Sequence, residues 1–223
     1  MSYCFAPAVP SVEVVGRPER YAVRRIWCLG RNYAEHVREM GFAAKDTQVF
    51  FSKPADAVVP GGGEVPYPSM TDNLHHEIEL VVAIGKAGTD IPAGRAAEFV
   101  FGCAAGIDLT RRDLQATLRK EGRPWELAMA FDHSAPISAI RPGPAPEGGT
   151  IWLAVNGLDR QRGNLANMLW TVPEIIAALS AYVALAPGDL IFTGTPEGVG
   201  PLQRGDRVTG GIEGVGELGI TLV

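Results

Sequence analysis

Side chains that can bind metals or transfer protons are concentrated in residues 75–79 (HHEIE). The apolar residues that follow predict a β-strand over His76–Ile84, in which alternate side chains point to the same face. Glu77 and Glu79 then lie on one face, about 7 Å apart along the strand. Two carboxylates this close repel each other unless a cation or a shared proton lies between them.

A third carboxylate, Asp108, ends the next predicted strand, Phe99–Ile107. Three carboxylates on neighbouring strands form an all-oxygen site, which suits Mg²⁺, Mn²⁺ or Ca²⁺ and not zinc. The alternative interpretation is that Glu77 and Glu79 lie on the solvent face of an edge strand and that Asp108 is unrelated to them. Both interpretations are compatible with the local pattern.

A second candidate pair lies nearer the N-terminus, in a predicted helical segment at Asn32–Met40. His36 and Glu39 are three residues apart there, so they share one helix face. A carboxylate beside an imidazole orients the ring and raises its basicity, which is how a pair that deprotonates water is built. A solvent-exposed polar pair is the simpler alternative.

A glycine-rich loop at residues 193–200 (TGTPEGVG) follows a predicted strand at Leu190–Phe192. Its backbone N–H groups and threonine hydroxyls are suited to holding an oxyanion or a carboxylate. The loop lacks the Gly-Lys-Ser/Thr ending of a phosphate-binding loop, so the pattern does not support nucleotide binding.

The elements that must position these residues are short and mostly strands. The 27 glycines and 17 prolines among 223 residues predict many turns and a β-rich fold. Further strands are predicted at Arg25–Leu29, Val49–Ser52 and Ile151–Val155, and the last of these ends in an Asn-Gly hairpin turn. The stretch at residues 60–68 is predicted to be a loop or an irregular hairpin.

Two longer helices are expected from their N-terminal residues. Thr110 and Asp113 fit a capping box at the start of a helix over Thr110–Lys120. Thr171 and Glu174 fit a second capping box, before a segment with apolar residues at helical spacing.

Charge and hydropathy exclude several classes of function. The net charge is −5 and no run of Lys or Arg stands out, which argues against nucleic acid or an anionic membrane as a partner. The longest apolar stretch, Ile175–Ala186, is too short to span a bilayer, and the N-terminus shows no signal peptide. The three cysteines are far apart and odd in number, so no disulfide scaffold is indicated. These features predict a soluble cytoplasmic protein.

Six motifs then occur in a fixed order along the chain. They are residues 28–41 (CLGRNYAEHVREMG), 51–54 (FSKP), 73–85 (NLHHEIELVVAIG), 108–115 (DLTRRDLQ), 131–136 (FDHSAP) and 194–200 (GTPEGVG). Together they resemble the fumarylacetoacetate hydrolase superfamily, and within it most closely the bacterial fumarylpyruvate hydrolases and acylpyruvases. The resemblance covers residues 21–223, which are predicted to form a single catalytic domain after an N-terminal arm at residues 1–20.

The resemblance implies a β-rich α+β fold, with mixed β-sheets rolled around the active site, a few short helices and a homodimeric assembly. It also implies that Glu77, Glu79 and Asp108 bind one Mg²⁺ or Mn²⁺, which Ca²⁺ can replace in crystals. By the same resemblance, His36 and Glu39 form the pair that activates water, on a segment that closes over the substrate.

Other residues match positions that line the family's substrate pocket. These positions are Arg31, Tyr33, Lys53, Arg112, Gln115 and Thr195, and Gln115 is expected to position the water. One position departs from the family pattern, because Met129 stands where the family usually has a lysine. A methionine cannot donate a hydrogen bond or supply charge to an oxygen that becomes negative.

The predicted function is therefore metal-dependent hydrolysis of the carbon–carbon bond of a 2,4-dioxo acid, such as fumarylpyruvate or another acylpyruvate. Three alternatives use the same residues. They are decarboxylation of an oxaloacetate-type β-keto acid, isomerisation of a dienoic acid, and metal binding without catalysis, which the loss of the lysine at Met129 motivates.

Overall fold

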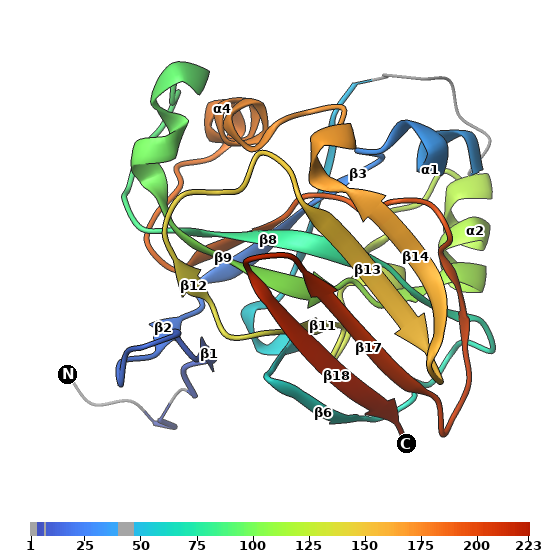
Figure 1. The fold of residues 1–223 in the computed structure, drawn as a ribbon. Helices are drawn as coiled ribbons and strands as arrows, with labels where there is room; N and C mark the ends of the chain where they lie inside the picture. Colours follow the sequence, from blue (N-terminus) through green and yellow to red (C-terminus); the bar gives the residue numbers. More distant parts are fainter. Residues whose placement is uncertain (1–3, 7, 40–46) are drawn as a thin grey trace.

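The structure, a computed structural model, describes residues 4–6, 8–39 and 47–223. An eight-stranded mixed β-sheet passes through it (Figure 1). Its strands run in the order β4 (Val49–Lys53), β3 (Arg25–Gly30), β15 (Asp189–Phe192), β8 (Ile78–Ile84), β9 (Val100–Ile107), β11 (Ala135–Ile137) and β5 (Val58–Pro60), with β12 (Arg141–Pro142) also paired to β9. The pairs β3–β15 and β11–β5 are parallel, and the others are antiparallel.

A five-stranded sheet packs against β8 and β9 of the first sheet (Figure 1). Its strands run in the order β14 (Leu158–Asn164), β13 (Thr150–Val155), β17 (Arg207–Ile212), β18 (Gly216–Leu222) and β6 (Gly62–Val65). The predicted hairpin turn between β13 and β14 is confirmed, with Asn156 and Gly157 both at positive φ. The stretch predicted as a loop or irregular hairpin instead supplies β6, which pairs in parallel with β18.

Strand β8 is buried on both faces, which explains its continuous apolar sequence. Leu80 and Val82 point into a core shared with the five-stranded sheet and with helix α4 (Val172–Tyr182). Val81 and Ala83 alternate with them and point into a second core on the opposite face. The strand that carries Glu79 is therefore held between two packed layers.

The predicted strand at His76–Ile84 is interrupted at Glu77, so that prediction was wrong in detail. The preceding residues form β7 (Leu74–His76), which belongs to a separate three-stranded sheet with β10 (Thr110–Arg111) and β16 (Gly200–Leu202). Glu77 is the residue at which the chain passes from that sheet to the large one. It thus stands at a sheet junction and not inside one regular strand.

The helices are few and short, as predicted. They are α1 (Ala34–Glu39), α2 (Arg112–Lys120), α3 (Glu126–Met129) and α4, with 3₁₀ turns at Ala55–Ala57, Ala93–Phe99 and Leu165–Asn167. Met40, the last residue of the helical segment predicted there, lies outside the described residues.

The two predicted capping boxes had different outcomes. The box before α4 is confirmed, because the Thr171 N–H donates to Glu174 Oε2 at 2.8 Å. The box before α2 is wrong, since Thr110 belongs to β10 and the helix begins two residues later. Asp113 instead accepts a hydrogen bond from the Thr71 hydroxyl and so attaches α2 to the loop before β7.

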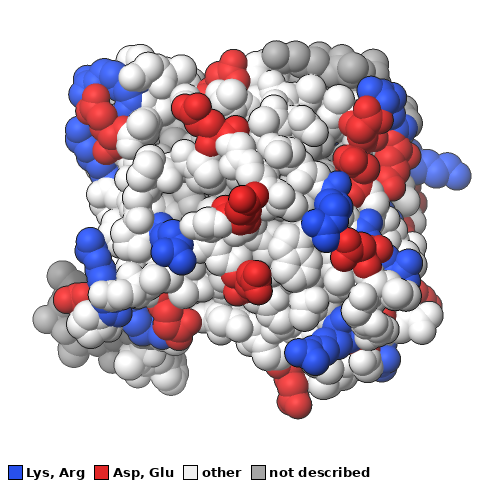
Figure 2. All heavy atoms as spheres, viewed as in Figure 1, with Lys and Arg blue, Asp and Glu red and all other residues white. Residues whose placement is uncertain are grey.

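These sheets and helices confirm the predicted fold class of rolled mixed sheets with a few short helices. Part of the predicted arm, β1 (Ser11–Val12), pairs with β2 (Tyr21–Ala22), and Val12 and Val14 are buried in the second core. On the face shown in Figure 2, acidic and basic side chains are interspersed. Within the described residues, no helix is long and apolar enough to cross a membrane.

Candidate active site

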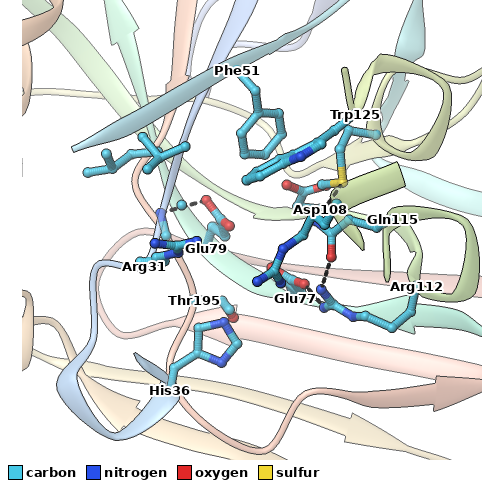
Figure 3. Close-up of a pocket in the computed structure, with 16 residues that line it drawn as sticks. Arg31, His36, Phe51, Glu77, Glu79, Asp108, Arg112, Gln115, Trp125 and Thr195 are labelled. Carbon is cyan, nitrogen blue, oxygen red and sulfur yellow. Dashed lines mark hydrogen bonds and ion pairs between the residues drawn. The ribbon is translucent and has the colours of Figure 1, made fainter. Parts of the chain in front are cut away.

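A cavity lies where β8 and β9 meet helix α2 and the start of α1 (Figure 3). Its lining residues come from strands, helices and the glycine-rich loop. They are Leu29, Gly30, Arg31, His36, Val49, Phe51, Glu77, Glu79, Asp108, Arg112, Gln115, Arg119, Trp125, Met129, Gly194 and Thr195. In the view of Figure 3, the carboxylates lie between the His36 ring on one side and the rings of Phe51 and Trp125 on the other.

The three predicted carboxylates converge in this cavity. One carboxylate oxygen from each of Glu77, Glu79 and Asp108 can be chosen so that all three lie within 4.8 Å of one another. The antiparallel pairing of β8 with β9 brings the three carboxylates to one end of the strand pair. Just beyond the last paired residues, the Asp108 N–H donates to the Glu77 carbonyl at 2.8 Å. All three side chains are buried. The alternative interpretation, in which Glu77 and Glu79 lie on the solvent face of an edge strand, is therefore wrong.

Each carboxylate has a different partner. Asp108 Oδ1 lies 2.8 Å from the ammonium of Lys53, and Arg112 forms an ion pair with Glu77. Glu79 Oε2 accepts a hydrogen bond from the Gly194 N–H at 2.7 Å. Gly194 adopts a φ of +95°, and a Cβ there would come within 2.6 Å of Asn32, so this loop position requires glycine.

Burial and mutual repulsion shift the pKa values of these groups. Burial raises the pKa of Asp108 to about 6, although the charge of Lys53 opposes the rise. Burial, Asp108 and Glu77 together hold the pKa of Glu79 well above its usual range. Burial acts the same way on Glu77, but the charges of Arg112 and His36 and the hydrogen bond from Arg112 together outweigh it and lower that pKa.

This donor set fits a divalent metal ion. Asp108 Oδ2 is buried and finds no hydrogen-bond partner among the described residues. Among the described residues, ion pairs join Lys53 to Asp108 and Arg112 to Glu77, whereas Glu79 is held by a backbone N–H. A divalent cation between the three carboxylates would relieve their mutual repulsion. Oxygen donors alone are the ligands that hard cations prefer. These three carboxylates therefore form a candidate site for a divalent metal ion.

The predicted pair on α1 forms and faces the same cavity. His36 Nδ1 lies 3.2 Å from Glu39 Oε2, and the His36 ring is 6% exposed and lines the cavity. Glu39 also accepts a hydrogen bond of 3.3 Å from the Gly198 N–H, which connects α1 to the glycine-rich loop. The His36 ring thus lines the cavity, while the Glu39 carboxylate holds its Nδ1 atom.

Helix α2 supplies a connected row of polar groups. Arg112 donates to Gln115 Oε1 at 2.6 Å as well as pairing with Glu77. Gln115 Nε2 lies 3.4 Å from Met129 Sδ, so the position where the family usually has lysine faces Gln115 across the cavity wall. The methionine sulfur is a weak acceptor and does not supply, at this point of the wall, the charge that a lysine would carry.

The remaining predicted residues separate into two groups. Arg31 and Thr195 line the cavity, but Lys53 and Tyr33 do not. Lys53 lies behind Asp108, where it also donates to the carbonyls of Leu109 and Met129. Tyr33 is 2% exposed, and burial is the main cause of a pKa raised above its usual value.

Sequence reasoning missed one buried residue that organises the site. The Gln161 amide, on β14, accepts from the Ile78 N–H at 3.1 Å and donates to Thr195 Oγ1 and to the Pro196 carbonyl, each at 2.8 Å. It therefore fixes both the sheet junction beside Glu77 and the glycine-rich loop. A lone Gln in an alternating strand carries no signal of this role.

Comparison with known proteins agrees with this geometry. The sequence profile of the fumarylacetoacetate (FAA) hydrolase C-terminal family matches residues 25–223. The chain belongs to the fumarylacetoacetate hydrolase family. The match confirms the predicted family and, with it, the prediction that the chain is an enzyme of a carbon–carbon bond hydrolase family acting on a small molecule.

Relatives within the family have two different activities in their names. The fumarylpyruvate hydrolase of a Ralstonia species is 46% identical over 175 residues, which cover 78% of this chain and 91% of the relative. The mitochondrial oxaloacetate tautomerase of Mus musculus is 45% identical over 195 residues, which cover 86% of this chain and 88% of the relative. Sequence similarity alone therefore does not distinguish between these two activities for this chain.

A solved structure from the same family superposes closely. The fumarylpyruvate hydrolase of Pseudomonas aeruginosa, in complex with Mn²⁺ and pyruvate, has a TM-score of 0.97 and 50% identity. The likeness covers 100% of this chain and 99% of that one. The similarity agrees with a divalent-metal site in the chain described here.

Proposed function

We propose that the chain is a metal-dependent hydrolase that cleaves the C3–C4 bond of fumarylpyruvate or of a related acylpyruvate. The observation that carries the proposal is the His36–Glu39 pair, which faces the three carboxylates across one cavity. Tautomerisation and decarboxylation do not consume water, so a water-activating pair beside a metal centre favours hydrolysis. The Ralstonia and Pseudomonas relatives support the same activity.

In this proposal, Glu77, Glu79 and Asp108 would hold the divalent cation, whose Lewis acidity stabilises negative charge that develops on substrate oxygens. We propose Mg²⁺ or Mn²⁺ as that cation. Arg112 stands beside Glu77 and is placed to bind the carboxylate of the pyruvyl end.

The proton transfers belong to α1. His36 Nδ1 is held by Glu39, so Nε2 is the atom that takes a proton from water. The hydroxide attacks the C4 carbonyl carbon, the C3–C4 bond breaks, and the bonding electrons and a proton end on C3 of pyruvate. Gln115 lies on the cavity wall with its amide held by Arg112, which suits it to orient the water.

The role proposed for Thr195 is narrower than the sequence suggests. Its hydroxyl donates to the Ile78 carbonyl at 2.8 Å and accepts from Gln161. Because the Thr195 hydroxyl already donates its proton to Ile78, it has no proton left to donate to a substrate oxygen. In this proposal, the backbone N–H groups of the loop make that contact instead. Tyr33 and Lys53 then support the site from behind the cavity surface.

Oxaloacetate tautomerisation is the second candidate, because the Mus musculus relative is as similar as the Ralstonia one. It needs the metal and a base at C3 but no water. β-Keto acid decarboxylation and dienoate isomerisation would also use the metal centre without the His36–Glu39 pair.

One experiment separates these candidates. Purified protein with Mn²⁺ is given fumarylpyruvate and, in parallel, oxaloacetate, and the ultraviolet absorbance and the products are followed. Hydrolysis predicts loss of fumarylpyruvate with formation of fumarate and pyruvate, abolished by chelator. Conversion of oxaloacetate enol to the keto form alone would favour the tautomerase, and formation of CO₂ and pyruvate would favour the decarboxylase. Binding without any conversion would identify a catalytically inactive relative.

We propose that the enzyme is a homodimer, in line with the family resemblance. We also propose that residues 21–223 form one catalytic domain, which follows an N-terminal arm at residues 1–20. We also propose a cytoplasmic location, as for a bacterial enzyme of small-molecule catabolism, although the Mus musculus relative is mitochondrial. Size-exclusion chromatography with light scattering tests the dimer directly.

A further inference from the structure

The two halves of the glycine-rich loop are attached to different parts of the molecule. The first half directly follows β15 and is bonded to β8. The Thr193 N–H and hydroxyl both donate to the Leu80 carbonyl, at 3.0 and 2.9 Å. The Gly194 N–H donates to the carboxylate of Glu79 on the same strand. The first half is therefore fixed by the strand that carries a proposed metal ligand.

The second half of the loop lies on strand β14 instead. The Gln161 side chain donates to the Pro196 carbonyl at 2.8 Å. A Cβ on Gly198 would come within 2.1 Å of the Arg160 carbonyl oxygen. A Cβ on Gly163 would come within 2.8 Å of Pro196 Cβ. Two glycines thus allow the loop and the strand to lie in direct contact.

This second half carries the contact to the His36–Glu39 pair. The Gly198 N–H donates to Glu39 Oε2 at 3.3 Å, and the same oxygen lies 3.2 Å from His36 Nδ1. A displacement of Pro196 and Gly198 away from β14 would therefore move the hydrogen-bond donor of Glu39. The donor of Glu79 would stay in place, because it belongs to the half of the loop that is bonded to β8.

The Gln161 amide is fully buried and uses all of its hydrogen-bonding capacity. Its Oε1 accepts from the Ile78 N–H at 3.1 Å and from His76 Nδ1 at 3.0 Å. Its Nε2 donates to Thr195 Oγ1 and to the Pro196 carbonyl. Because the amide oxygen can only accept and the NH₂ group can only donate, these partners fix which end of the side chain faces the loop.

We propose that Gln161 is a positioning residue for the activation of water, which holds the second half of the loop on β14 and thereby places the Glu39 carboxylate. This inference rests on the proposed function, because it assigns Gln161 to the step that the His36–Glu39 pair carries out. Replacement of Gln161 should therefore lower turnover and leave the metal site intact, since the four hydrogen bonds of the amide go to groups other than the three carboxylates.

Gln161→Met removes the amide and keeps an unbranched side chain of similar length. We expect kcat for fumarylpyruvate to fall about 10- to 100-fold, because a displacement of about 1 Å can cost about 10²-fold in rate. The Mn²⁺ affinity, measured by calorimetry, should change by less than about threefold, since larger losses follow from removal of a direct partner of a ligand. Gln203→Met makes the same change at an exposed glutamine and should alter neither quantity. Circular dichroism shows whether each variant is folded.

A double-mutant cycle distinguishes this role from a general structural one. If Gln161 acts through Glu39, then Gln161→Met should cost less than about twofold further in a Glu39→Ala background. A further loss in that background as large as in the wild type would show that the effect does not pass through Glu39, and it would overturn the inference.

Gly163→Ala moves the loop without removing a hydrogen bond, because the added Cβ would come within 2.8 Å of Pro196 Cβ. We expect the same pattern, with a lower kcat and an unchanged Mn²⁺ affinity. This variant also tests the inference if Gln161→Met does not fold. Gly94→Ala is the matched control, since a Cβ there would meet no atom within 4 Å.

Hydrogen exchange separates failure of this inference from failure of the proposed function. In both loop variants, backbone amides in residues 34–39 and 196–200 should exchange faster than in the wild type, and those in residues 79–84 should not. Unchanged exchange in the first two segments, or a loss of Mn²⁺ affinity as large as the loss of turnover, would overturn the inference. If the exchange pattern is as expected but wild-type protein does not hydrolyse fumarylpyruvate, the proposed reaction fails and the placement of α1 by Gln161 stands.

Discussion

The two halves of the candidate active site are built very differently. Glu79 lies on β8, a strand packed between two cores, and the residue is 2% exposed. The side chain of Glu39 lies on the six-residue helix α1 and is 37% exposed. A helix this short is not stable by itself and depends on contacts made by a few of its residues.

The difference indicates a division of roles. The carboxylates are held in place before any ligand binds, by Lys53, Arg112 and the Gly194 N–H, at the cost of repulsion among them. The His36–Glu39 pair is attached by one hydrogen bond from Gly198 and by the buried side chain of Val37. Changes to the carboxylates should therefore alter metal binding and stability, and changes to α1 should alter turnover alone.

The largest effect is expected at Glu79. Glu79→Gln removes a proposed metal ligand, so Mn²⁺ binding should weaken and hydrolysis should be lost. Loss of a residue that only supports a ligand costs roughly 10–100-fold in metal affinity, and loss of the ligand itself should cost more. Because the pKa of Glu79 is raised, its charge destabilises the folded protein, and the chelated variant should melt higher than chelated wild type. Calorimetry with Mn²⁺ and thermal melts with chelator measure both effects.

Glu217→Gln is the control for that change, because Glu217 is exposed on β18 and should leave both quantities unchanged. Undiminished Mn²⁺ affinity in Glu79→Gln would show that the three carboxylates do not form the metal site.

The next effect is expected on α1. His36→Ala and Glu39→Gln should each lower the rate of hydrolysis by about 10²–10⁴-fold, the usual cost of losing a positioned general base. Affinity for Mn²⁺ and for pyruvate or oxalate should be largely retained, since among the described residues the hydrogen bonds of these two side chains join them to each other and to Gly198 and not to the carboxylates. Glu35→Gln is the matched control on the same helix, where Glu35 pairs with exposed Arg38. Hydrolysis at the wild-type rate by either site variant would remove the pair from the mechanism.

A gain of activity is expected at Met129. Met129→Lys should place an ammonium next to Gln115, beside the oxygen that becomes negative, and raise fumarylpyruvate hydrolysis by up to about 10²–10³-fold. Methionine and lysine have similar lengths, so the wall should not be overpacked. Leu127→Lys, on the exposed side of α3, controls for the added charge.

The competing explanation for Met129 is that it packs against a more apolar substrate. In that case Met129→Lys would be no faster with fumarylpyruvate, and the parent enzyme would prefer an acylpyruvate with an alkyl tail. Steady-state rates of both proteins with both substrates decide between the two explanations.

The smallest effect concerns pH. The folded-state pKa of Asp108, about 6, and that of Glu79 lie above their unfolded values, so the chelated folded protein binds extra protons there. Protonation of these two groups therefore makes the chelated protein more stable as the pH falls from 7.5 through 6. In the loaded protein, protons compete with Mn²⁺ for the same carboxylates, so the stabilisation by Mn²⁺ decreases over the same range. The difference in Tm between loaded and chelated protein should therefore shrink over this range. A difference that grows as the pH falls would contradict this assignment.

Residue spacing predicted which side chains lie together better than it predicted the strands and helices that carry them. The separation of Glu77 from Glu79, and the position of Asp108 at a strand end, indicated a three-carboxylate site as one of two interpretations, and the family resemblance favoured it. The structure brings the three carboxylates together. The i, i+3 spacing of His36 and Glu39 likewise predicted their contact.

The sequence did not predict features that depend on contacts between distant segments. The interruption at Glu77 arises because β7 pairs with β10 and β16, which are far apart in the chain. Thr110 and Asp113 fit a cap, but Thr110 joins β10 and Asp113 bonds to the loop before β7. The buried roles of Lys53 and Gln161 depend on partners more than thirty residues away, so spacing carries no signal of them.

Product analysis with two proteins tests the division of roles most directly. Wild-type protein and His36→Ala, both loaded with Mn²⁺, are incubated with fumarylpyruvate, and fumarate, pyruvate and protein-bound Mn²⁺ are quantified. The account predicts equal amounts of fumarate and pyruvate from the wild type, and unconverted substrate with full Mn²⁺ occupancy in the variant. Equal hydrolysis by both proteins, or loss of Mn²⁺ from His36→Ala, would contradict it.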